Sequence, residues 1–387
     1  HEEDERHERR ENTRQTLEQI FPDYISGNED TLMYVINFSD EKGYALLAYD
    51  FRVLAISDKG NMFLSDFTRP FDENGYREET PKFVIRDLVN ESLLNVNTVR
   101  VTDTDSIGEI YFPCVKDDYD MFSFDTVISE KVGPFCPMKL NQSHPYNYFC
   151  PTINGDTCIA GCVAIAIANI FSANRYPEFR GTITWNDIIS RWNDYADTHN
   201  SFFFISLNSS NPENIPILDL AGRIYIIGTG VNMDYGILSS TAYDRDARIF
   251  MKDFGYEDAH IRLLRNVNYA DYMSRNTPLY ISGSRQTDDG KTGHAWVLDG
   301  MADFSVYLKR YIGDSEIDIP CVIMNKLVHC NYGWGGSCDG YYEYKLFDLS
   351  SGPIFDDDYL DDEDLSIDWE GGDANRYYKY YLRIITY

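Results

Sequence analysis

The chain has 387 residues, of which 43% are hydrophobic, and this is enough apolar material for two ordinary domains or one large one. Its formal net charge of −29 argues against a nucleic-acid-binding or anionic-membrane-binding protein, because both need a basic surface. No apolar run approaches the roughly 20 residues of a membrane-spanning helix. The first residues, HEEDERHERRENTRQ, are charged throughout, so no signal peptide is visible, although a leader could have been removed.

The first half of the chain reads as a helix, a strand meander and a second helix. A charged helix is expected at about 1–21, and apolar residues at helical spacing after Pro81 predict another at 80–96. Between them, turn sequences separate the strands of an antiparallel meander, at 31–38, 43–50 and 53–64. Residues 97–130 are acidic and weakly patterned, and we expect a linker there.

A turn-rich segment runs into an almost continuous apolar stretch in DTCIAGCVAIAIANI, residues 156–170. Asp156 or Thr157 is a candidate N-cap for a helix. The alternation VAIAIA also permits a strand, but the length and the capping signal favour a buried helix. On that reading Cys162 lies in or near the first turn, where backbone N–H groups and the macrodipole favour a thiolate. The alternative is a buried cysteine that packs as a small hydrophobic residue.

The rest of the second half contains short strands and a glycine-rich segment, at 278–285, 293–301, 327–346 and 377–387. Eight cysteines are too few for a disulfide-built scaffold of this length. Because no CxxC or HxxxH pair accompanies them, we do not expect a structural zinc site. We expect no other metal and no cofactor. Cys150 and Cys158 flank a turn and could form a short disulfide or remain thiols.

A cysteine nucleophile needs a base, a group that orients the base, and donors for the oxyanion. His294, flanked by small residues at the start of an apolar strand, is the candidate base. Asn331 can accept from one imidazole nitrogen and fix the tautomer that faces the thiol, with Trp334 in the same glycine-rich segment. Gln142 could donate an amide N–H to the oxyanion. Each of these residues alone also fits an ordinary turn, loop or core position.

The order Cys162, His294, Asn331 is that of papain-like peptidases. His294 lies 132 residues beyond Cys162, within the roughly 130–150 expected for papain, whereas Asn331 falls later, at 169. Several segments resemble the streptopain family of secreted bacterial cysteine peptidases: NQSHPYN, AGCVAIAIANI, MDYGILSSTAY, GHAWVLDGM and HCNYGWGGSCDGYY. The resemblance spans residues 141–387, and YVINFSDEKGYALLAYDFRVLAISDKG in the first half is similar to the family propeptide.

The resemblance implies specific roles for individual residues. It places the nucleophile at Cys162, the base at His294 and an oxyanion-hole donor at Gln142, and we expect Asn331 to complete the catalytic set. The aromatic wall beside the histidine falls on Tyr332, where Trp is usual, and on Trp334. The residues expected to bind substrate are Gly161, Met233, Asp234, Tyr235, Gly236, Tyr332 and Trp334.

We therefore expect an α+β protein with an inhibitory propeptide domain at 1–127 and a papain-like catalytic domain at 128–387. The predicted function is a latent cysteine endopeptidase, secreted or on the cell surface or in the periplasm of a bacterium. It would hydrolyse proteins or peptides once its own propeptide, the expected intramolecular inhibitor, is cleaved within about 100–135. Two alternatives remain open: a non-catalytic binding protein on a degenerate peptidase fold, and amide transfer as in transglutaminase-like folds.

Residues 355–373, FDDDYLDDEDLSIDWEGGD, are densely acidic and lie where the streptopain family has a mobile glycine-rich loop. Such a cluster of carboxylates would raise the local concentration of cationic peptides. We predict a modest preference for substrates with Lys or Arg near the scissile bond. The simpler interpretation is a solvated acidic loop, and the spacing does not match an EF-hand calcium loop.

Overall fold

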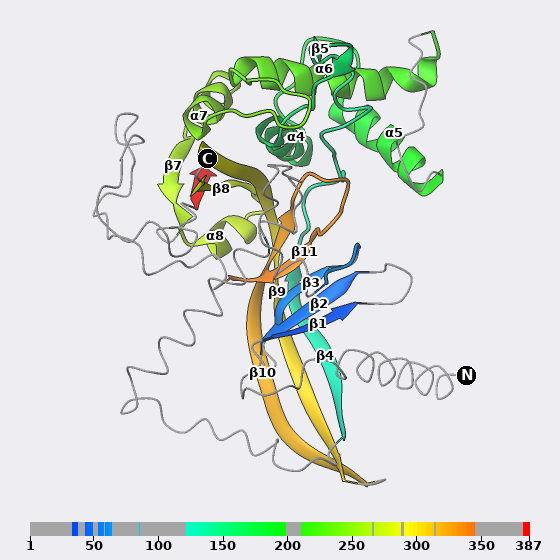
Figure 1. Ribbon diagram of the computed structural model, residues 1–387, viewed down its shortest axis with the longest axis vertical. Helices are drawn as coiled ribbons and strands as arrows, with labels where there is room; N and C mark the ends of the chain where they lie inside the picture. The colour runs from blue at the N-terminus through cyan, green and yellow to red at the C-terminus, as the bar shows by residue number, and fades with distance from the viewer. Residues whose placement is uncertain are drawn as a thin grey trace.

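The computed structural model describes residues 33–37, 43–48, 53–57, 59–63, 85, 121–198, 210–264, 267–287, 290–312, 315–344 and 382–387. Several predicted features lie outside these residues: the helix at 1–21, nearly all of the helix at 80–96 and the acidic segment 355–373. The described residues form a mixed helix and sheet architecture, as the predicted α+β class requires (Figure 1).

One large antiparallel sheet runs through the molecule in the order β1-β2-β3-β11-β10-β9-β8-β12-β7, with β4 also paired to β9. Its strands are β1 Met33–Asn37, β2 Tyr44–Ala48, β3 Val53–Ser57, β4 Met121–Val132, β7 His260–Leu263, β8 Leu279–Thr287, β9 Gly290–Ile312, β10 Ser315–Asn331, β11 Gly340–Glu343 and β12 Arg383–Thr386. The predicted meander is therefore confirmed as β1, β2 and β3, although β3 is shorter than expected. Strand β9 extends well beyond the predicted 293–301 because β8, β10 and β4 all pair with it.

Strand β4 corrects the C-terminal part of the linker predicted at 97–130, because residues 121–130 belong to a strand, and residues 97–120 lie outside the described residues. Residues 121–132 pair with β9 from Met121 opposite Tyr311 to Val132 opposite Met301. In Figure 1, β4, β9 and β10 run together as a long arm beyond the rest of the sheet. The boundary predicted between residues 127 and 128 falls inside this strand, and the division into two domains stays a prediction.

The side chains of β9 alternate between the two faces of the sheet. Ala295 and Val297 belong to the core shared with the helices, whereas Trp296 and Leu298 belong to the core on the other face. This alternation follows from the two-residue period of a strand. Each face is therefore covered by its own hydrophobic cluster.

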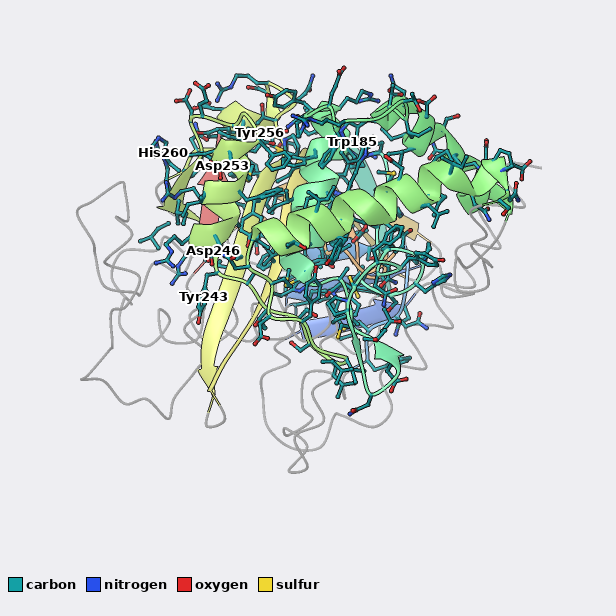
Figure 2. All side chains as sticks on the ribbon, turned by 90° about the horizontal axis from the view of Figure 1, so that it is seen from above. Trp185, Tyr243, Asp246, Asp253, Tyr256 and His260 are labelled. Carbon is teal, nitrogen blue, oxygen red and sulfur yellow. The ribbon has the colours of Figure 1, made fainter. Side chains whose placement is uncertain are left out.

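A layer of helices covers one face: α4 Cys162–Asn174, α5 Trp185–Thr198, α6 Ile215–Gly230 and α7 Asp244–Asp253. Figure 2 shows this layer from above, with Trp185 at the start of α5 and Asp246 in the first turn of α7. Helix α4 contacts β8 and β9 and also α6 and α7. Its central position explains why residues 163–172 are all buried and why the sequence there is apolar on nearly every side.

The start of α4 differs from the expected cap. Asp156 and Thr157 form the short strand β6, which pairs with β5 Thr152–Ile153, so neither caps the helix. The N-cap is Gly161, which has φ 87° and no side-chain cap hydrogen bond. The predicted helix is confirmed, and Cys162 is its first residue.

The N-terminal strands join the sheet through β11, and apolar side chains of these strands belong to the core on the face opposite to α4, α5, α6 and α7. In the β3–β11 pairing, Ser57 lies opposite Gly340 and Ala55 opposite Tyr342. The Tyr44 and Tyr342 hydroxyls are 2.8 Å apart and hydrogen-bonded. Tyr44, Leu46 and Leu54 share one hydrophobic cluster with Trp296 and Tyr332, and the short helix α8 Tyr269–Met273 completes it. The segments predicted as propeptide and as catalytic domain thus share a sheet and a core.

The described residues contain neither a candidate membrane-spanning helix nor a candidate metal cluster. None of the helices that the structure describes is both long and apolar enough to cross a membrane. No group of three or more His, Cys, Asp or Glu side chains in the described part of the chain is arranged to hold a metal ion. Cys150 and Cys158, for which a disulfide was left open, are both thiols.

Candidate active site

The face of helix α4 that carries Cys162 packs against the loop that follows β10. Cys162, Ile165 and Asn169 are spaced three and seven residues apart and therefore lie along one face of the helix. Asn169 donates from Nδ2 to Asn331 Oδ1 at 3.2 Å. A Cβ atom added to Gly333 would lie 2.7 Å from Ile165 Cγ2, which shows how closely this loop packs on the first turn. Cys162, one turn nearer the helix start, lies on the same face and is partly exposed.

Because no side chain caps α4, its first backbone N–H groups remain available at the end that carries the thiol. The positive end of the helix dipole at this position favours a thiolate and any developing negative charge.

His294, on β9, is surrounded by aromatic rings. Its ring centroid lies 6.0 Å from Trp296, 6.3 Å from Tyr332 and 6.0 Å from Trp334. Burial lowers the pKa of the imidazole to about 4, and the hydrogen bond to the Tyr332 carbonyl opposes this shift. The imidazole is therefore neutral at neutral pH, which is the state in which it can accept a proton.

The contacts of the imidazole assign its tautomer. Nε2 lies 2.9 Å from the Tyr332 carbonyl oxygen, and a carbonyl oxygen can only accept, so Nε2 carries the proton. The Trp334 indole N–H approaches the same nitrogen at 3.4 Å, which is a long contact. Nδ1 is then left with a lone pair, and no described residue donates a hydrogen bond to it. The hydrogen bonds described for the imidazole thus join it to Tyr332 and Trp334.

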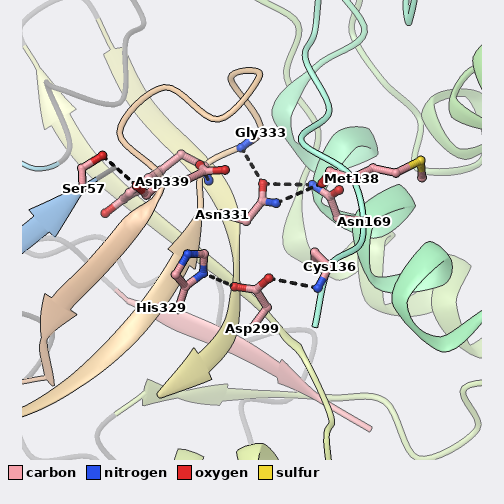
Figure 3. Close-up of polar contacts among 10 residues, drawn as sticks. Ser57, Cys136, Met138, Asn169, Asp299, His329, Asn331, Gly333 and Asp339 are labelled. Atoms are coloured by element: carbon pink, nitrogen blue, oxygen red, sulfur yellow. Dashed lines mark hydrogen bonds and ion pairs between the residues drawn. The ribbon is translucent and has the colours of Figure 1, made fainter. Parts of the chain in front are cut away.

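Asn331 does not make the predicted hydrogen bond to the imidazole. Its Oδ1 accepts from Gly333 N at 3.1 Å as well as from Asn169, and its Nδ2 donates to the Met138 carbonyl at 3.3 Å (Figure 3). The reason is strand alternation: Asn331 lies opposite Val297, whose side chain faces the helices, whereas His294 stacks on Trp296 and Tyr332.

Asn331 nevertheless acts on the histidine through one peptide group. The Gly333 N–H that donates to Asn331 and the Tyr332 carbonyl that accepts from His294 belong to the same peptide unit. Since hydrogen bonds in series polarise one another, Asn331 both orients this carbonyl and makes it a better acceptor.

Gln142 supplies a buried donor with no partner. The residue is 2% exposed, and its side-chain Nε2 has no hydrogen-bond partner among the residues that the structure describes. Its backbone carbonyl accepts from Ala160 N at 2.9 Å, two residues before Cys162. A buried amide N–H is normally satisfied, so its position beside the thiol-bearing helix end marks it as a candidate oxyanion donor.

The segment around 233–241 packs against the residues just before Cys162. A Cβ atom on Gly161 would lie 2.6 Å from Met233 Sδ, so only glycine fits between the helix start and this segment. The Gly236 carbonyl accepts from Ile159 N at 3.1 Å. Asp234 is exposed and forms an isolated antiparallel bridge with Thr241.

Of the remaining predicted substrate-binding residues, Tyr235 is partly buried and stacks on Tyr225 with a centroid distance of 6.4 Å. Tyr332 is 0% exposed, so its side chain packs beside the imidazole from within the core, and its role in substrate binding stays a prediction. Trp334 is partly exposed beside the imidazole.

A family comparison covers all of these elements. The model of the peptidase C10 family matches residues 140–342, which is more than half of the 387-residue chain. The chain belongs to the peptidase C10 family. The matched range includes Gln142, Cys162, His294 and Asn331, and the predicted resemblance to the streptopain family is confirmed. The predicted α+β class is confirmed as well, since helices and a large antiparallel sheet make up the described residues.

Individual relatives of this C10 chain are distant. Streptopain from Streptococcus pyogenes is 25% identical over 360 residues, covering 82% of this chain and 75% of streptopain. The thiol protease/hemagglutinin PrtT from Porphyromonas gingivalis is 24% identical over 351 residues, covering 84% of this chain and 35% of PrtT. A solved fragment of Prevotella intermedia prointerpain A has a TM-score of 0.48 at 19% identity, covering 83% of this chain and 91% of that chain.

Two buried carboxylates near this site, Asp299 and Asp339, were not predicted from the sequence. Asp299 Oδ1 pairs with His329 Nδ1 at 2.5 Å and its Oδ2 accepts from Cys136 N at 3.1 Å, which ties the segment before α4 to the sheet (Figure 3). Asp339 accepts from Tyr332 N at 2.8 Å. Asp339 sits in the turn GSCDG, where an aspartate reads as an ordinary turn residue, so the sequence alone gave no signal.

Proposed function

We propose that this chain is a latent cysteine endopeptidase in which Cys162 is the nucleophile and His294 the base. The observation that carries the proposal is the buried, unpartnered Gln142 amide N–H beside the uncapped helix end that bears Cys162. A buried donor without a partner costs stability, which makes sense where a reaction intermediate supplies the acceptor. Membership of the peptidase C10 family supports the reaction type.

The proposed reaction is acyl transfer in two steps. Nδ1 of His294 takes the Cys162 thiol proton, and the thiolate sulfur attacks the scissile carbonyl carbon. The oxyanion that forms accepts from Gln142 Nε2 and from the backbone N–H of Cys162. The imidazolium then protonates the leaving amine and the C–N bond breaks. Water, deprotonated by the same imidazole, hydrolyses the thioester and returns the thiol.

The contacts of the N-terminal strands support latency. Ser57 Oγ donates to the Asp339 carbonyl at 2.7 Å, and Lys59 Nζ donates to the Gly335 carbonyl at 2.9 Å. Both acceptors lie in the loop that continues from Tyr332 and Trp334. We propose that these strands hold that loop, and with it the imidazole, in an arrangement where His294 is bonded to the Tyr332 carbonyl and is not yet placed for catalysis. Their removal would free the histidine to approach the thiol.

The position of β4 narrows the proposed processing region. Cleavage after residue 121 would have to cut a strand that is paired along β9, whereas residues 100–120 precede it. We therefore propose processing N-terminal to β4, within 100–120 of the originally expected 100–135. Mass spectrometry of the fully active protein tests this: a new N-terminus in that range is expected, and an intact N-terminus would refute latency.

Protein or peptide substrates, and secretion by a bacterium, complete the proposal. The relatives' names, streptopain and thiol protease, support the substrate class. An activity test uses the processed chain under reducing conditions with an unfolded protein substrate. Hydrolysis that is lost on treatment with a peptidyl electrophile directed at thiols, with the label on Cys162, is the expected result.

A non-catalytic binding protein on a peptidase fold is the second candidate. One observation favours it: the hydrogen bonds described for the imidazole join it to Tyr332 and Trp334. Failure of the processed chain to hydrolyse any member of a peptide library under reducing conditions would establish this candidate in place of the peptidase.

A further inference from the structure

The carbonyl that orients His294 belongs to a residue held at its other end by a buried carboxylate. Asp339 is 1% exposed, and its Oδ1 accepts from Tyr332 N at 2.8 Å. The Tyr332 carbonyl oxygen lies 2.9 Å from His294 Nε2. The backbone of Tyr332 therefore links the carboxyl group of Asp339 to the imidazole of His294.

The backbone of Asp339 is itself fixed from two sides. Its N–H donates to the Gly336 carbonyl at 3.2 Å, which closes the turn before β11. Its carbonyl accepts from Ser57 Oγ at 2.7 Å, a bond visible in Figure 3. Because the Asp339 backbone is held in this way, its carboxyl oxygen fixes the orientation of the Tyr332 N–H. Asn331 Oδ1 accepts from the next peptide N–H, that of Gly333.

We propose that Asp339 is a positioning residue for the peptidase reaction, holding the Tyr332 backbone so that its carbonyl fixes the His294 ring and the Nε2–H tautomer. This inference rests on the proposed function, in which His294 is the base. Loss of the Asp339 acceptor would let the Tyr332 peptide rotate. The imidazole would then lose its orientation toward the thiol while the substrate-contacting segment around Met233 stays in place.

The surroundings of Asp339 set its charge. The titratable groups that interact with it are His329, Asp299, Lys139, Tyr44, Cys136 and Cys330. Burial raises the pKa of the Asp339 carboxyl to about 7, and the Tyr332 N–H, His329 and Lys139 limit the rise. Either form of the carboxyl offers an oxygen to the Tyr332 N–H, but the carboxylate is the stronger acceptor.

The experiment compares Asp339→Ala and Asp339→Asn with the wild-type full chain. Asp219→Ala is the matched control, because it removes another structural carboxylate, paired with Arg223 at 2.6 Å and with no residue of the site. Two readouts are measured. The first is kcat and KM for an unfolded protein substrate after processing, and the second is the pH dependence of Cys162 alkylation by iodoacetamide in the processed chain.

The alanine variant is expected to lower kcat by about 10- to 100-fold, as small misplacements of catalytic groups do, with KM within about threefold of wild type. Because asparagine keeps an acceptor oxygen, Asp339→Asn should keep kcat within about threefold of wild type at pH 7. In the wild type, kcat should rise as the Asp339 carboxyl ionises around pH 7, because the carboxylate is the stronger acceptor, and the asparagine variant should lack this rise. Asp219→Ala should match wild type. If Asp339→Ala does not fold, Asp339→Ser takes its place, since the serine hydroxyl stops one atom short of the Tyr332 amide.

A folded Asp339→Ala or Asp339→Ser variant with wild-type kcat would overturn the inference, and so would an asparagine variant as impaired as alanine. If the wild-type chain hydrolyses no substrate, the proposed function fails. The alkylation profile then still decides the role of Asp339. A shift of the Cys162 profile to higher pH in the alanine variant supports it, and an unchanged profile refutes it.

Discussion

The Asp339→Asn substitution should change the pH dependence of stability in a way that can be worked out from the structure. Burial raises the pKa of the Asp339 carboxyl from 3.8 to about 7. Between these values the folded state binds more protons than the unfolded state, so the contribution of Asp339 to stability falls as pH rises. Asparagine does not titrate, and the variant loses this dependence.

The size of the effect follows from the two pKa values. A shift of one pKa unit corresponds to about 1.36 kcal/mol. Over the interval from pH 5 to pH 7, where the carboxyl of the unfolded chain is ionised and that of the folded chain becomes half ionised, the integrated change is about 2 kcal/mol. The difference in the free energy of unfolding, Asp339→Asn minus the parent protein, should therefore increase by about 2 kcal/mol between pH 5 and pH 7.

The assay is urea unfolding followed by tryptophan fluorescence at pH 5 and pH 7, with both proteins in a Cys162→Ala background to prevent self-cleavage. Other titrating groups are common to the two proteins, so most of their contribution cancels in the difference. A stability difference that stays the same at both pH values, or that moves in the opposite direction, would show that the Asp339 carboxyl is not held neutral by burial.

Three further substitutions test the site. Gln142→Ala should lower kcat by about 10²- to 10³-fold with little change in KM, as loss of one oxyanion donor does, and steady-state kinetics with an unchanged kcat would remove Gln142 from the oxyanion hole. Gly161→Ala places a Cβ 2.6 Å from Met233 Sδ at a residue with φ 87°, and should destabilise the chain by about 1–3 kcal/mol in urea unfolding. Adding Met233→Ala should restore part of that loss, whereas strictly additive effects would argue against the clash. Asn331→Ala leaves Gly333 N without its acceptor and should lower kcat by about 10-fold, with KM nearly unchanged; a rise in KM alone would point to a substrate contact instead.

The positions of Cys162 and His294 in the fold could be predicted from the sequence, whereas the hydrogen-bond partners of the site residues could not. Cys162 at a helix start could be predicted because a turn-rich segment meets an apolar run, although the residues expected to cap the helix form a strand instead. His294 could be placed on a strand from its apolar context. The partner of the imidazole could not be predicted, because it depends on which face of the sheet each side chain occupies. A register shift between His329 and Cys330 fixes that face for Asn331, and no local pattern reveals it.

Long-range pairing explains the other misses. Strand β4 is built from a sequence that is weakly patterned on its own, and it becomes a strand by pairing with β9 far along the chain. The bond between Ser57 and Asp339 likewise joins residues separated by 282 positions. Local propensity carries no information about such partners, so the sharing of one sheet by the N-terminal strands and the catalytic segment emerged only in three dimensions.

The most direct test of the peptidase proposal is the hydrolysis of an unfolded protein by processed wild-type chain, Cys162→Ala and the control Cys158→Ala under reducing conditions. Cys158 is a buried thiol four residues before Cys162 and outside the proposed chemistry. Cys158→Ala is expected to retain activity and Cys162→Ala to have none, while both variants stay folded. Hydrolysis by the Cys162→Ala protein at the wild-type rate would contradict it.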